Sequence, residues 1–375
     1  MKHFKTALFI HHGSTLGGAT VSLFETLKRI DRKKCKVIVL LPAEGPLCDL
    51  LKEEGIRYKI VPLFILYYCP QFKTRVSFKT TSLLVIKLIQ NILYLPNVLR
   101  RENPDVVIIN SSTLLASGLI AKMMRKTVIW HIREIISTER SWLMKKLFSA
   151  IIRFSAKKVI VNSTFSFNDM LKLKIKSLCL ISNGVDLNKF CQQNRLNGDG
   201  QKVALVGQIY KGKGYRILLQ AAFLMKQKLP RAQFIIVGYG GEDAFFRELV
   251  NEMKLEDHFI FLGPRFDVEN ILRTVNCLVF ASIFPETFGR VMVEAMACGL
   301  PVIASNTGAS PEIVIHNQTG LLIEPGKPKV LADALFEILT DDNKARAMGE
   351  AGRKRAEELF DVDKITPQLL EAYGI

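Results

Sequence analysis

Two glutamates, Glu286 and Glu294, flank the start of an apolar stretch in the segment PETFGRVMVEAMACGLPVIAS. Residues 291–298 are mostly small or apolar at helical spacing, and residues 300–304 resemble a buried strand, so the segment predicts a loop, a helix, a turn and a strand. Gly289 then stands near the helix start, where free backbone N–H groups and the helix dipole favour an anion. Carboxylates on either side of such an anion can accept hydrogen bonds from hydroxyl groups of a ligand. The alternative is that both are solvated surface charges.

The elements that must position these carboxylates follow from the rest of the chain, where apolar strand-like runs alternate with amphipathic helical runs. The predicted strands are 6–10, 36–41, 58–61, 105–110, 127–132 and 158–163, followed by 202–207, 232–238, 258–263, 277–282, 300–305 and 320–325. Repeated strand and helix units with short connections predict parallel sheets that carry helices on both faces. Two such series predict two doubly wound α/β domains, with the break in the polar stretch 182–201.

Ligands bind beyond the carboxyl ends of strands in open parallel sheets, so the loops after the predicted strands are the candidate binding positions. Gly17-Gly18 ends one such loop and opens a helix, and Lys213-Gly214 precedes another helix. His131 stands at a strand end and is followed by Arg133-Glu134. Each feature has an ordinary structural alternative, namely a simple turn, a solvated lysine and a core histidine.

The composition excludes several classes of protein. The 375 residues are 49% hydrophobic, which permits large cores and excludes a disordered chain. Seven cysteines form no C-x-x-C pair, which predicts reduced structural thiols in a reducing compartment and no cysteine metal site. The first apolar run is too short for the core of a signal peptide, and residues 82–99 contain polar residues that argue against a transmembrane helix. The adjacent pair His11-His12 has no further metal ligands near it in the sequence, so no metal site is expected.

The net charge is concentrated in one half of the chain. Residues 1–185 contain 30 Lys and Arg against 11 Asp and Glu, whereas the remainder contains 22 against 24. This asymmetry indicates that the first half faces a phospholipid surface, a phosphorylated acceptor or nucleic acid, or else reflects a generally basic proteome. Residues 64–90 and 139–158 mix aromatic and aliphatic residues with Lys and Arg, so they are candidates for interfacial helices on anionic lipid or for core helices of the sheet.

Taken together, these motifs resemble those of the retaining glycosyltransferases of family 4, which have the two-domain GT-B fold. The resemblance covers essentially the whole chain. Gly207 and Lys213-Gly214 match the family's phosphate loop, and GYGG at 238–241 matches its Gly-x-Gly loop. The run at 285–304 matches the family's E-x7-E motif and the Gly-x-Pro-Val-Ile-Ala segment that follows it, and the linker motif Asn-Gly-Val-Asp stands at 183–186.

The resemblance implies two Rossmann-like domains that face a central cleft. Residues 1–185 are expected to form the acceptor-side domain, and residues 186–355 the domain that binds the nucleotide sugar. Residues 356–375 are expected to form a C-terminal helix that packs back on the first domain.

The resemblance also assigns roles around the donor diphosphate. Lys213 would supply positive charge to the phosphates as the leaving group departs, where charge develops in the transition state. Glu286 would contact the donor sugar, Glu294 would hold the ribose hydroxyls, and His131 would donate a hydrogen bond to the sugar. The catalytic candidates are therefore Glu286, His131 and Lys213.

Further donor contacts are carried over from the family to matching positions. The backbone near Gly263, Pro264 and Arg265 would read the base, and the Gly17-Gly18 turn would close over the phosphates. The donor-binding candidates are Gly17, Gly18, Gln208, Lys213, Gly263, Arg265, Phe288, Gly289, Arg290, Val291 and Glu294.

Two positions depart from the family's pattern. Gln208 stands where the family has a phosphate-binding arginine, and a neutral amide cannot form the charge-assisted fork that arginine forms. Three alternatives follow. Either Lys211 or Arg290 supplies the positive charge that the arginine would have supplied, or donor binding is weaker, or the diphosphate is held differently. Arg290 replaces a small or apolar residue of the family, and its side chain is a candidate to reach an acceptor phosphate.

The implied activity is transfer of a hexosyl group from a UDP- or GDP-sugar to a hydroxyl of a glycan or lipid-linked acceptor, with retention of configuration. No metal and no cofactor are implied, since the nucleotide sugar is a substrate and no Asp-x-Asp motif stands in a suitable loop. The expected pathway is synthesis of a cell-surface polysaccharide or lipopolysaccharide. The protein is expected in the cytoplasm, as a peripheral protein on the inner face of the plasma membrane.

Other functions stay open. A GT-B-fold sugar-nucleotide epimerase would bind the same donor, and a donor-binding pseudoenzyme would keep the site without turnover. A dehydrogenase is disfavoured because 238–243 lacks the third glycine or alanine of the dinucleotide fingerprint. A basic nucleic-acid-binding protein is suggested by charge alone, without a recognised nucleic-acid-binding motif, so nucleic acid is not an expected partner.

Overall fold

The computed structural model describes residues 4–66, 78–137, 141–191 and 201–375, although the side chains of 78–81 lie outside the description. The chain divides into two compact units. Unit 1 comprises Met1–Gly184 with Val362–Ile375, and unit 2 comprises Val185–Asp361. The first domain was predicted to end at residue 185, one residue after the observed end of its first segment. The C-terminal segment was predicted to begin at residue 356, six residues before its observed start at Val362.

Unit 1 is built on a seven-stranded parallel sheet with the order β3-β2-β1-β4-β5-β6-β7. Its strands are β1 Lys5–Ile10, β2 Cys35–Leu41, β3 Arg57–Ile60, β4 Val106–Ile109, β5 Thr127–Ile132, β6 Lys158–Val161 and β7 Leu178–Leu180. The central strands β4, β5 and β6 are short runs rich in Val and Ile, and they are buried on both faces apart from the first residues of β5 and β6. This burial is the condition under which an all-parallel sheet is stable.

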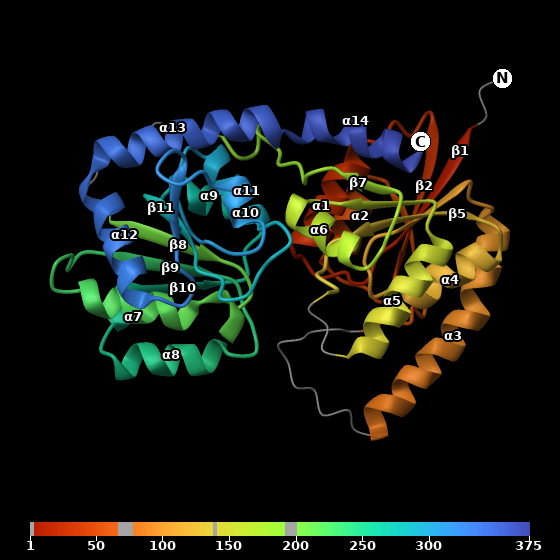
Figure 1. Cartoon of the computed structure of the whole chain (residues 1–375), viewed down its shortest axis with the longest axis horizontal. Helices are drawn as coiled ribbons and strands as arrows, with labels where there is room; N and C mark the ends of the chain where they lie inside the picture. Colours follow the sequence, from red (N-terminus) through yellow and green to blue (C-terminus); the bar gives the residue numbers. More distant parts are fainter. Residues whose placement is uncertain (1–3, 67–77, 138–140, 192–200) are drawn as a thin grey trace. The chain divides into compact units, whose positions relative to one another are not determined.

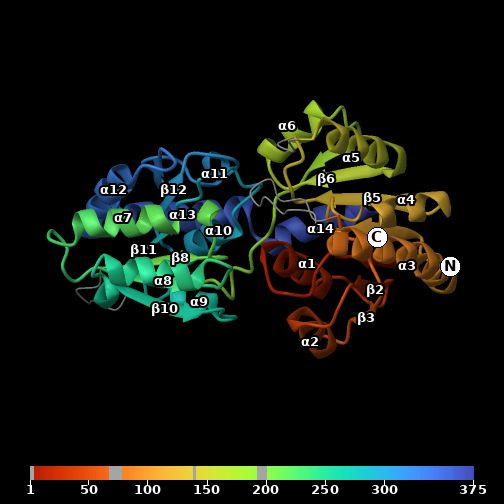
Figure 2. The ribbon, with the colours of Figure 1, turned by 90° about the horizontal axis from the view of Figure 1, so that it is seen from below.

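Helices cover both faces of this sheet (Figures 1 and 2). The helices of unit 1 are α1 Gly18–Lys28, α2 Pro46–Glu53, α3 Phe78–Glu102, α4 Leu115–Met123, α5 Trp142–Ser155, α6 Thr164–Lys172 and α14 Val362–Tyr373. Side chains from α3, α4, α5 and α6 join one buried cluster, and those from α1, α2 and α14 join the cluster on the opposite face. The exposed residues of α3 and α5 therefore face outward from the same layer.

The C-terminal helix α14 packs against the sheet and α1 of unit 1. The ring of Tyr373 meets that of Phe9 edge to face, with centroids 5.6 Å apart. Nε of Arg29, the C-cap residue of α1, donates to Asp363 Oδ1 at 2.6 Å. A β-carbon on Gly184, where the chain leaves unit 1, would lie 2.5 Å from Cα of Val362, where it returns. Only glycine fits between the outgoing and returning segments there.

Unit 2 contains a six-stranded parallel sheet with the order β10-β9-β8-β11-β12-β13. Its strands are β8 Lys202–Val206, β9 Gln233–Val237, β10 Phe259–Gly263, β11 Cys277–Phe280, β12 Val302–Ser305 and β13 Gly320–Ile323. The order places β8 and β11, which are not consecutive, side by side in the middle of the sheet. The crevice at such a crossover is where doubly wound sheets bind ligands.

The helices of unit 2 also form two layers. They are α7 Tyr215–Met225, α8 Asp243–Glu252, α9 Val268–Leu272, α10 Arg290–Ala297, α11 Ser310–Ile313, α12 Pro328–Thr340 and α13 Asp342–Leu359, with short 3-10 turns η1 Lys211–Lys213 and η2 Glu256–His258. The helices α7, α8 and α12 share one buried cluster, α9 and α10 share the other, and α13 contributes side chains to both.

All twelve predicted strands are present in the sheets, and one further strand was missed. The strand β7 has three residues, none of them fully buried, at the edge of its sheet. Its apolar run, Leu178 to Ile181, is at the short end of strand length and is too short to identify a strand by periodicity alone.

Candidate functional site

A lysine and a glutamate from distant parts of unit 2 meet in an ion pair. Lys213 Nζ lies 2.5 Å from Glu286 Oε1, and the two side chains keep 20% and 25% of their surface exposed. The Glu286 carboxylate also accepts a short hydrogen bond from Ser282 Oγ. The sequence predicted the lysine and the glutamate but not Ser282. The pair is accessible enough for an anionic ligand to compete with Glu286 for the ammonium group.

The position of Lys213 depends on a close backbone approach at Gly214. Gly214 has φ +76, and a β-carbon there would lie 2.0 Å from the carbonyl oxygen of Ala281. Ile283 N donates to Gly212 O at 2.8 Å, which ties η1 to the loop that follows β11. Because glycine alone permits this approach, η1 delivers its lysine to the carboxyl end of β11.

The Glu286 backbone is fixed from the other side by the loop after β12. Ala309 N donates to Glu286 O at 3.0 Å. Gly308 has φ +58, and a β-carbon there would lie 2.4 Å from Glu286 O. The sequence contains Gly308 without any recognised motif around it, so this support was not predicted.

The helix α10 begins beside the same pair. Its N-cap residue Gly289 is in the left-handed conformation, and a β-carbon there would meet the ring of Phe280 at 2.9 Å. Lys213 Nζ lies 5.4 Å from the centroid of that ring. The lysine and the helix start therefore both lie against the ring of Phe280. A helix N-terminus and an ammonium group this close together favour an anion.

The second glutamate of the motif is held inside the first turns of α10. Arg290 Nε donates to Glu294 Oε1 at 2.7 Å, and the two side chains are only 7% and 11% exposed. Arg290 was predicted as a candidate to reach an acceptor phosphate. The structure instead places its side chain among buried groups, paired with Glu294 at i, i+4. The pair orients the Glu294 carboxylate and neutralises its charge.

Three glycines allow the backbone segments after β8 and β9 to approach each other closely. Gly207 N donates to Val237 O, and a β-carbon on Gly238 would lie 1.9 Å from Gly207 O. Gly240 approaches the backbone of Ile209 in the same way. The buried hydroxyl of Tyr215 donates to Gly207 O at 2.8 Å, and burial raises its pKa well above the ordinary value, so it stays a neutral donor. These contacts fix the two glycine loops that the sequence predicted.

The remaining donor candidates of unit 2 are on its surface or in its core. Gln208 and Lys211 are exposed. Gly263 ends β10 in the left-handed conformation with open space around it. Arg265 is engaged in a two-pronged ion pair with Asp267, with contacts of 2.8 and 2.7 Å, and this pair lowers the pKa of Asp267 to about 2.

Phe288 and Val291 contribute to packing. Phe288 is 4% exposed, and its ring meets that of Phe360 edge to face with centroids 5.7 Å apart. Val291 is half-buried in the first turn of α10 against the same cluster. The side chain of Phe288 is therefore unavailable to a ligand, and any contact from this position comes from its backbone.

Gly17 and Gly18 belong to unit 1 and open α1. Gly17 is the N-cap of that helix, and Val21 N donates to its carbonyl at 2.9 Å. Both glycines are exposed, with no atom within 4 Å of where a β-carbon would stand. The helix start is thus open to an approaching group.

His131 lies deeper than its predicted role requires. Its side chain is 1% exposed on β5, and Nδ1 is hydrogen-bonded to the hydroxyl of Tyr373 at 2.7 Å. Burial and the nearby charge of Arg133 hold the pKa of the imidazole well below its ordinary value. Nδ1 is therefore engaged by α14, whereas Nε2 has no hydrogen-bond partner among the described residues, and the contact with a sugar stays a prediction.

A polar network at the strand ends of unit 1 was missed by sequence reasoning. Asn110 Nδ2 lies 2.9 Å from His11 Nδ1, and Asn110 Oδ1 accepts a bond from Arg133 Nε at 3.3 Å. Arg133 Nη1 also donates to Asn183 Oδ1 at 2.5 Å. Arg133 is half-buried at the end of β5. The strand-end positions of His11 and Arg133 were visible in the sequence, but their partners were not.

Fold and site together define a class of protein. Two separate doubly wound parallel-sheet units, one of which presents a lysine–glutamate pair beside a helix start, are the GT-B architecture of glycosyltransferases. Comparison with known families agrees. Residues 187–355 match the family described as Glycosyl transferases group 1, and residues 16–189 match Glycosyltransferase Family 4. The chain belongs to this group of GT-B glycosyltransferases, of the family 4 type.

Relatives and solved structures support the assignment. The chain is 36% identical over 142 residues to N-acetyl-alpha-D-glucosaminyl L-malate synthase of Bacillus anthracis, covering 38% of the chain and 37% of the relative. It is 31% identical over 182 residues to a GDP-mannose-dependent phosphatidylinositol monomannoside mannosyltransferase of Mycobacterium tuberculosis, covering 46% and 47%. These matches therefore span less than half the length of either relative.

A solved structure matches over nearly the whole chain. The Anabaena protein HepE in complex with UDP and glucose superposes with a TM-score of 0.82 at 25% sequence identity, covering 99% of each chain. This likeness extends the family assignment over both units.

Proposed function

We propose that this protein transfers a hexosyl group from a UDP- or GDP-sugar to a hydroxyl group of a glycan or lipid-linked acceptor. The observation that carries the proposal is the Lys213–Glu286 pair, with its 2.5 Å contact beside the start of α10. A diphosphate placed at this helix start would take the ammonium group of Lys213 from Glu286 and neutralise part of its own charge. The Anabaena relative binds UDP and glucose, and the mycobacterial relative uses GDP-mannose, which supports both donor classes.

In the proposed mechanism the protein stabilises the charge that develops on the leaving phosphate. Lys213 supplies a fixed positive charge, and the first turn of α10 supplies backbone N–H groups. Glu286, once freed from the lysine, is an acceptor for hydroxyl groups of the donor sugar, and Glu294 is the candidate for the ribose hydroxyls. The anomeric configuration is retained, and neither a metal nor a cofactor takes part. The setting that we favour is assembly of a cell-surface polysaccharide or lipopolysaccharide.

The first test is a panel of UDP- and GDP-sugars scored by thermal stabilisation of the full chain. A donor that binds the folded state raises the melting temperature. Sugars that stabilise are then incubated with a pool of lipid-linked and glycan acceptors, and the products are identified by mass spectrometry and by the anomeric coupling constant. Reactions with and without EDTA test metal independence.

The outcomes separate this proposal from its alternatives. Transfer of the sugar with retained anomeric configuration supports it. Release of an altered free sugar nucleotide without acceptor assigns an epimerase instead. Stabilisation by a donor with no turnover on any acceptor identifies a binding protein, and absence of stabilisation by every nucleotide sugar overturns the proposal.

A further inference from the structure

The helix α3 presents an apolar surface to solvent. Seven of its large hydrophobic side chains between 83 and 94 are half exposed or more, namely Leu83 (56%), Val85 (50%), Ile86 (50%), Ile89 (52%), Ile92 (50%), Leu93 (61%) and Tyr94 (57%), whereas Leu84 and Leu88 are partly buried. Ile86 and Leu93 lie two turns apart, on the side opposite the buried Leu95 and Leu99. An amphipathic helix of a soluble domain carries polar residues on that side. Contiguous exposure of this kind marks an interaction surface.

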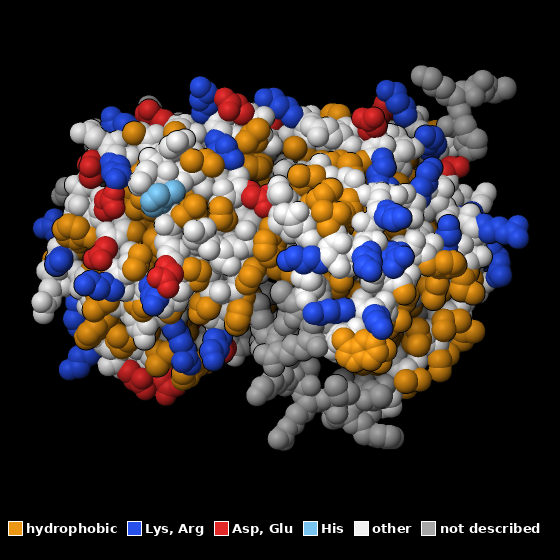
Figure 3. All heavy atoms as spheres, in the orientation of Figure 1, with side chains coloured by type: hydrophobic (Ala, Val, Ile, Leu, Met, Phe, Trp, Pro, Cys, Tyr) orange, Lys and Arg blue, Asp and Glu red, His pale blue; other side chains and the backbone are white. Residues whose placement is uncertain are grey.

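A second helix of the same layer repeats the pattern. Leu143, Leu147 and Phe154 on α5 are 62%, 43% and 60% exposed and recur at i, i+4 and i+11, along one side of the helix. Lys146 and Arg153 lie next to this stripe and are exposed. Hydrophobic side chains gather over the region of α3, α4 and α5, with Lys and Arg beside them (Figure 3).

The charges on and between these helices are mostly positive. Residues 82–180 contain 16 Lys and Arg against five acids, Glu102, Asp105, Glu134, Glu139 and Asp169. Glu102 forms an ion pair with Lys59, and Asp105 accepts a hydrogen bond from Thr6 N. Glu134 accepts hydrogen bonds from Ser111 and Ser112, and Asp169 accepts one from Ile136 N at 2.9 Å, so both acids are engaged within unit 1. Glu139 lies outside the described residues. The surface charge of this layer therefore comes mainly from its lysines and arginines and is positive.

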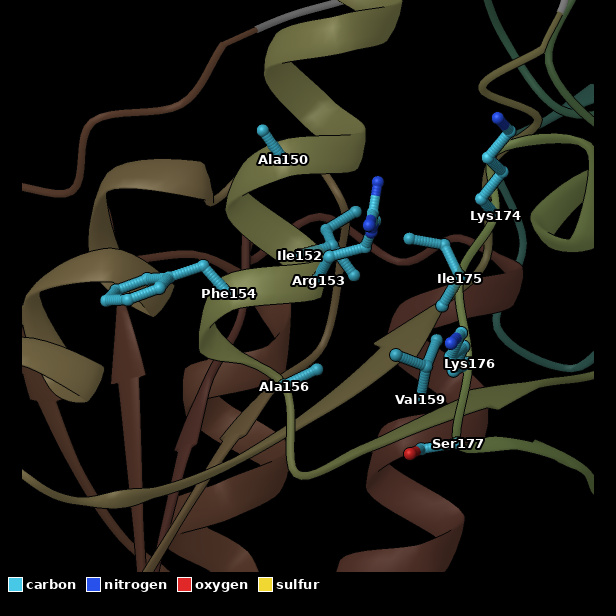
Figure 4. A pocket seen from close by; sticks show the side chains of 10 residues that line it. All are labelled: Ala150, Ile152, Arg153, Phe154, Ala156, Val159, Lys174, Ile175, Lys176 and Ser177. Carbon is cyan, nitrogen blue, oxygen red and sulfur yellow. The ribbon is translucent and has the colours of Figure 1, made fainter.

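A groove at the end of α5 extends the cationic surface. It has a volume of about 510 Å³ and an apolar floor that includes Ile152, Val159 and Ile175. Arg153, Lys174 and Lys176 line it from two different segments (Figure 4). Within the described parts of the chain, none of these three cations forms an ion pair. A hollow of this kind fits an anionic group attached to an apolar body.

We infer that the layer formed by α3, α4 and α5 docks unit 1 on the surface of an anionic lipid bilayer. The exposed aliphatic and aromatic side chains of α3 and α5 enter the boundary between head groups and acyl chains, and the surrounding cations bind lipid phosphates. Apolar exposure and positive charge on one layer favour this partner over the alternatives. Nucleic acid would use the cations and leave the aliphatic surface in water, whereas a second copy of the chain would bring like charges together. The inference does not depend on the donor or on the reaction.

The helix α3 lies on the membrane in this arrangement and does not cross it. Residues Ser82–Glu102 are long and apolar enough to span a bilayer, by length and composition. Yet Asn91 donates to Pro62 O and accepts from Ser117 Oγ. The buried Glu102 forms an ion pair with Lys59 at 2.5 Å. These contacts attach α3 to the sheet along one side and leave the other side free.

The test is flotation of the full-length protein with vesicles of phosphatidylcholine alone or mixed with phosphatidylglycerol. We expect binding to the anionic vesicles to exceed binding to the neutral ones by about tenfold or more, and to fall as salt is raised. The double variant Ile86→Gln/Leu93→Gln should lose most of the binding at any salt concentration. The double variant Lys146→Ala/Arg153→Ala should weaken binding to anionic vesicles by about tenfold and leave binding to neutral vesicles unchanged.

A matched control is available in unit 2, where Leu224 and Phe266 are 54% and 64% exposed. The variant Leu224→Gln/Phe266→Gln should float like the wild type. Because all substituted side chains are exposed, melting curves and stabilisation by a nucleotide sugar should not change in any variant. This readout keeps loss of docking distinct from loss of the fold or of donor binding.

Four results would overturn the inference. The first is equal flotation with neutral and anionic vesicles, or equal loss in the control variant. The second is binding that resists both high salt and alkaline carbonate, which assigns α3 as a spanning helix. The third is a dimer, detected by sedimentation velocity and abolished by Ile86→Gln/Leu93→Gln, without vesicle binding. The fourth is salt-sensitive binding to an RNA oligonucleotide, again without vesicle binding.

Discussion

Lys213 Nζ and Glu286 Oε1 lie 2.5 Å apart, although 73 residues separate them in the chain. The contact joins the turn before α7 to the loop before α10, and both segments follow central strands of the unit 2 sheet. In this ion pair the carboxylate occupies the ammonium group that an anionic substrate would use. The two side chains should therefore respond differently to substitution.

Glu286→Gln should lower turnover by about a hundredfold or more while stabilisation by the nucleotide sugar is kept or increased. The amide removes the negative charge that competes for Lys213, so the diphosphate binds at least as well, but the carboxylate at the donor sugar is lost. Lys213→Met should instead reduce both turnover and stabilisation. Glu337→Gln, which removes a carboxylate from a half-exposed ion pair elsewhere in unit 2, serves as the control. Equal effects of the two site variants on donor stabilisation would contradict the proposed roles.

Arg290→Met should destabilise unit 2 by about 3–5 kcal/mol, because it leaves the buried Glu294 carboxylate without its partner. The double variant Arg290→Met/Glu294→Leu should recover most of that stability but lose stabilisation by the donor. Urea unfolding of the single and double variants measures the coupling free energy. The exposed pair of Arg247 and Asp243 is the control and should contribute no more than about 1 kcal/mol. A coupling as small as in this exposed pair would show that burial does not strengthen the Arg290–Glu294 contact.

Gly214→Ala should destabilise unit 2 and reduce donor binding together. A left-handed conformation alone costs a non-glycine residue about 1–2 kcal/mol, and here the added methyl group would also press on the backbone of Ala281. Gly326→Ala, at φ +75 with open space around it, isolates the conformational cost. The difference between the two melting temperatures therefore reports the steric contact. Equal shifts would mean that η1 and the Ala281 backbone move apart at little cost.

Unit 1 should lose stability as the pH falls below about 6.5, because burial holds the pKa of His131 and His11 well below that value. The unfolded state then binds protons that the folded state excludes, so the free energy of unfolding rises with pH in this range and is fully restored above it. His131→Gln should weaken this dependence, because glutamine does not titrate there. Melting temperatures at several pH values test it, with His316→Gln, at an exposed position, as the control. An unchanged pH dependence in His131→Gln would contradict the role of this histidine.

Sequence reasoning found the strands and the motif glycines because both signals are local. A run such as TVIWHI is apolar enough to be a buried strand in any parallel sheet, and it forms β5 with the predicted limits. Gly289 was placed at the start of a helix from its neighbours alone, and it is the N-cap of α10. Two charged residues of the candidate site, Lys213 and Glu286, were likewise named from motif spacing.

The partners of these residues could not be read from the chain. Gly308 supports Glu286 from the loop after β12, whose approach depends on the order of strands in the sheet, and Ser282 contacts it from four residues earlier in the same loop. His131 was recognised as a strand-end residue, either a donor contact or a core histidine, but its hydrogen-bond partner Tyr373, which lies 242 residues further on, could not be predicted. The sequence predicts that a residue lies at the end of a strand, but it does not predict which residues pack against its side chain.

The amino-acid sequence by itself determined the fold class and the excess of positive charge in the first half, and it supplied the candidate residues for binding a diphosphate. Hydrophobic periodicity and glycine conformation act over a few residues, so they are legible without a structure. The tertiary structure alone decided which charges pair, which histidine is sealed from water and which apolar helix faces are left uncovered. Those properties arise from contacts between segments that are distant in the chain, and a linear pattern does not specify such contacts.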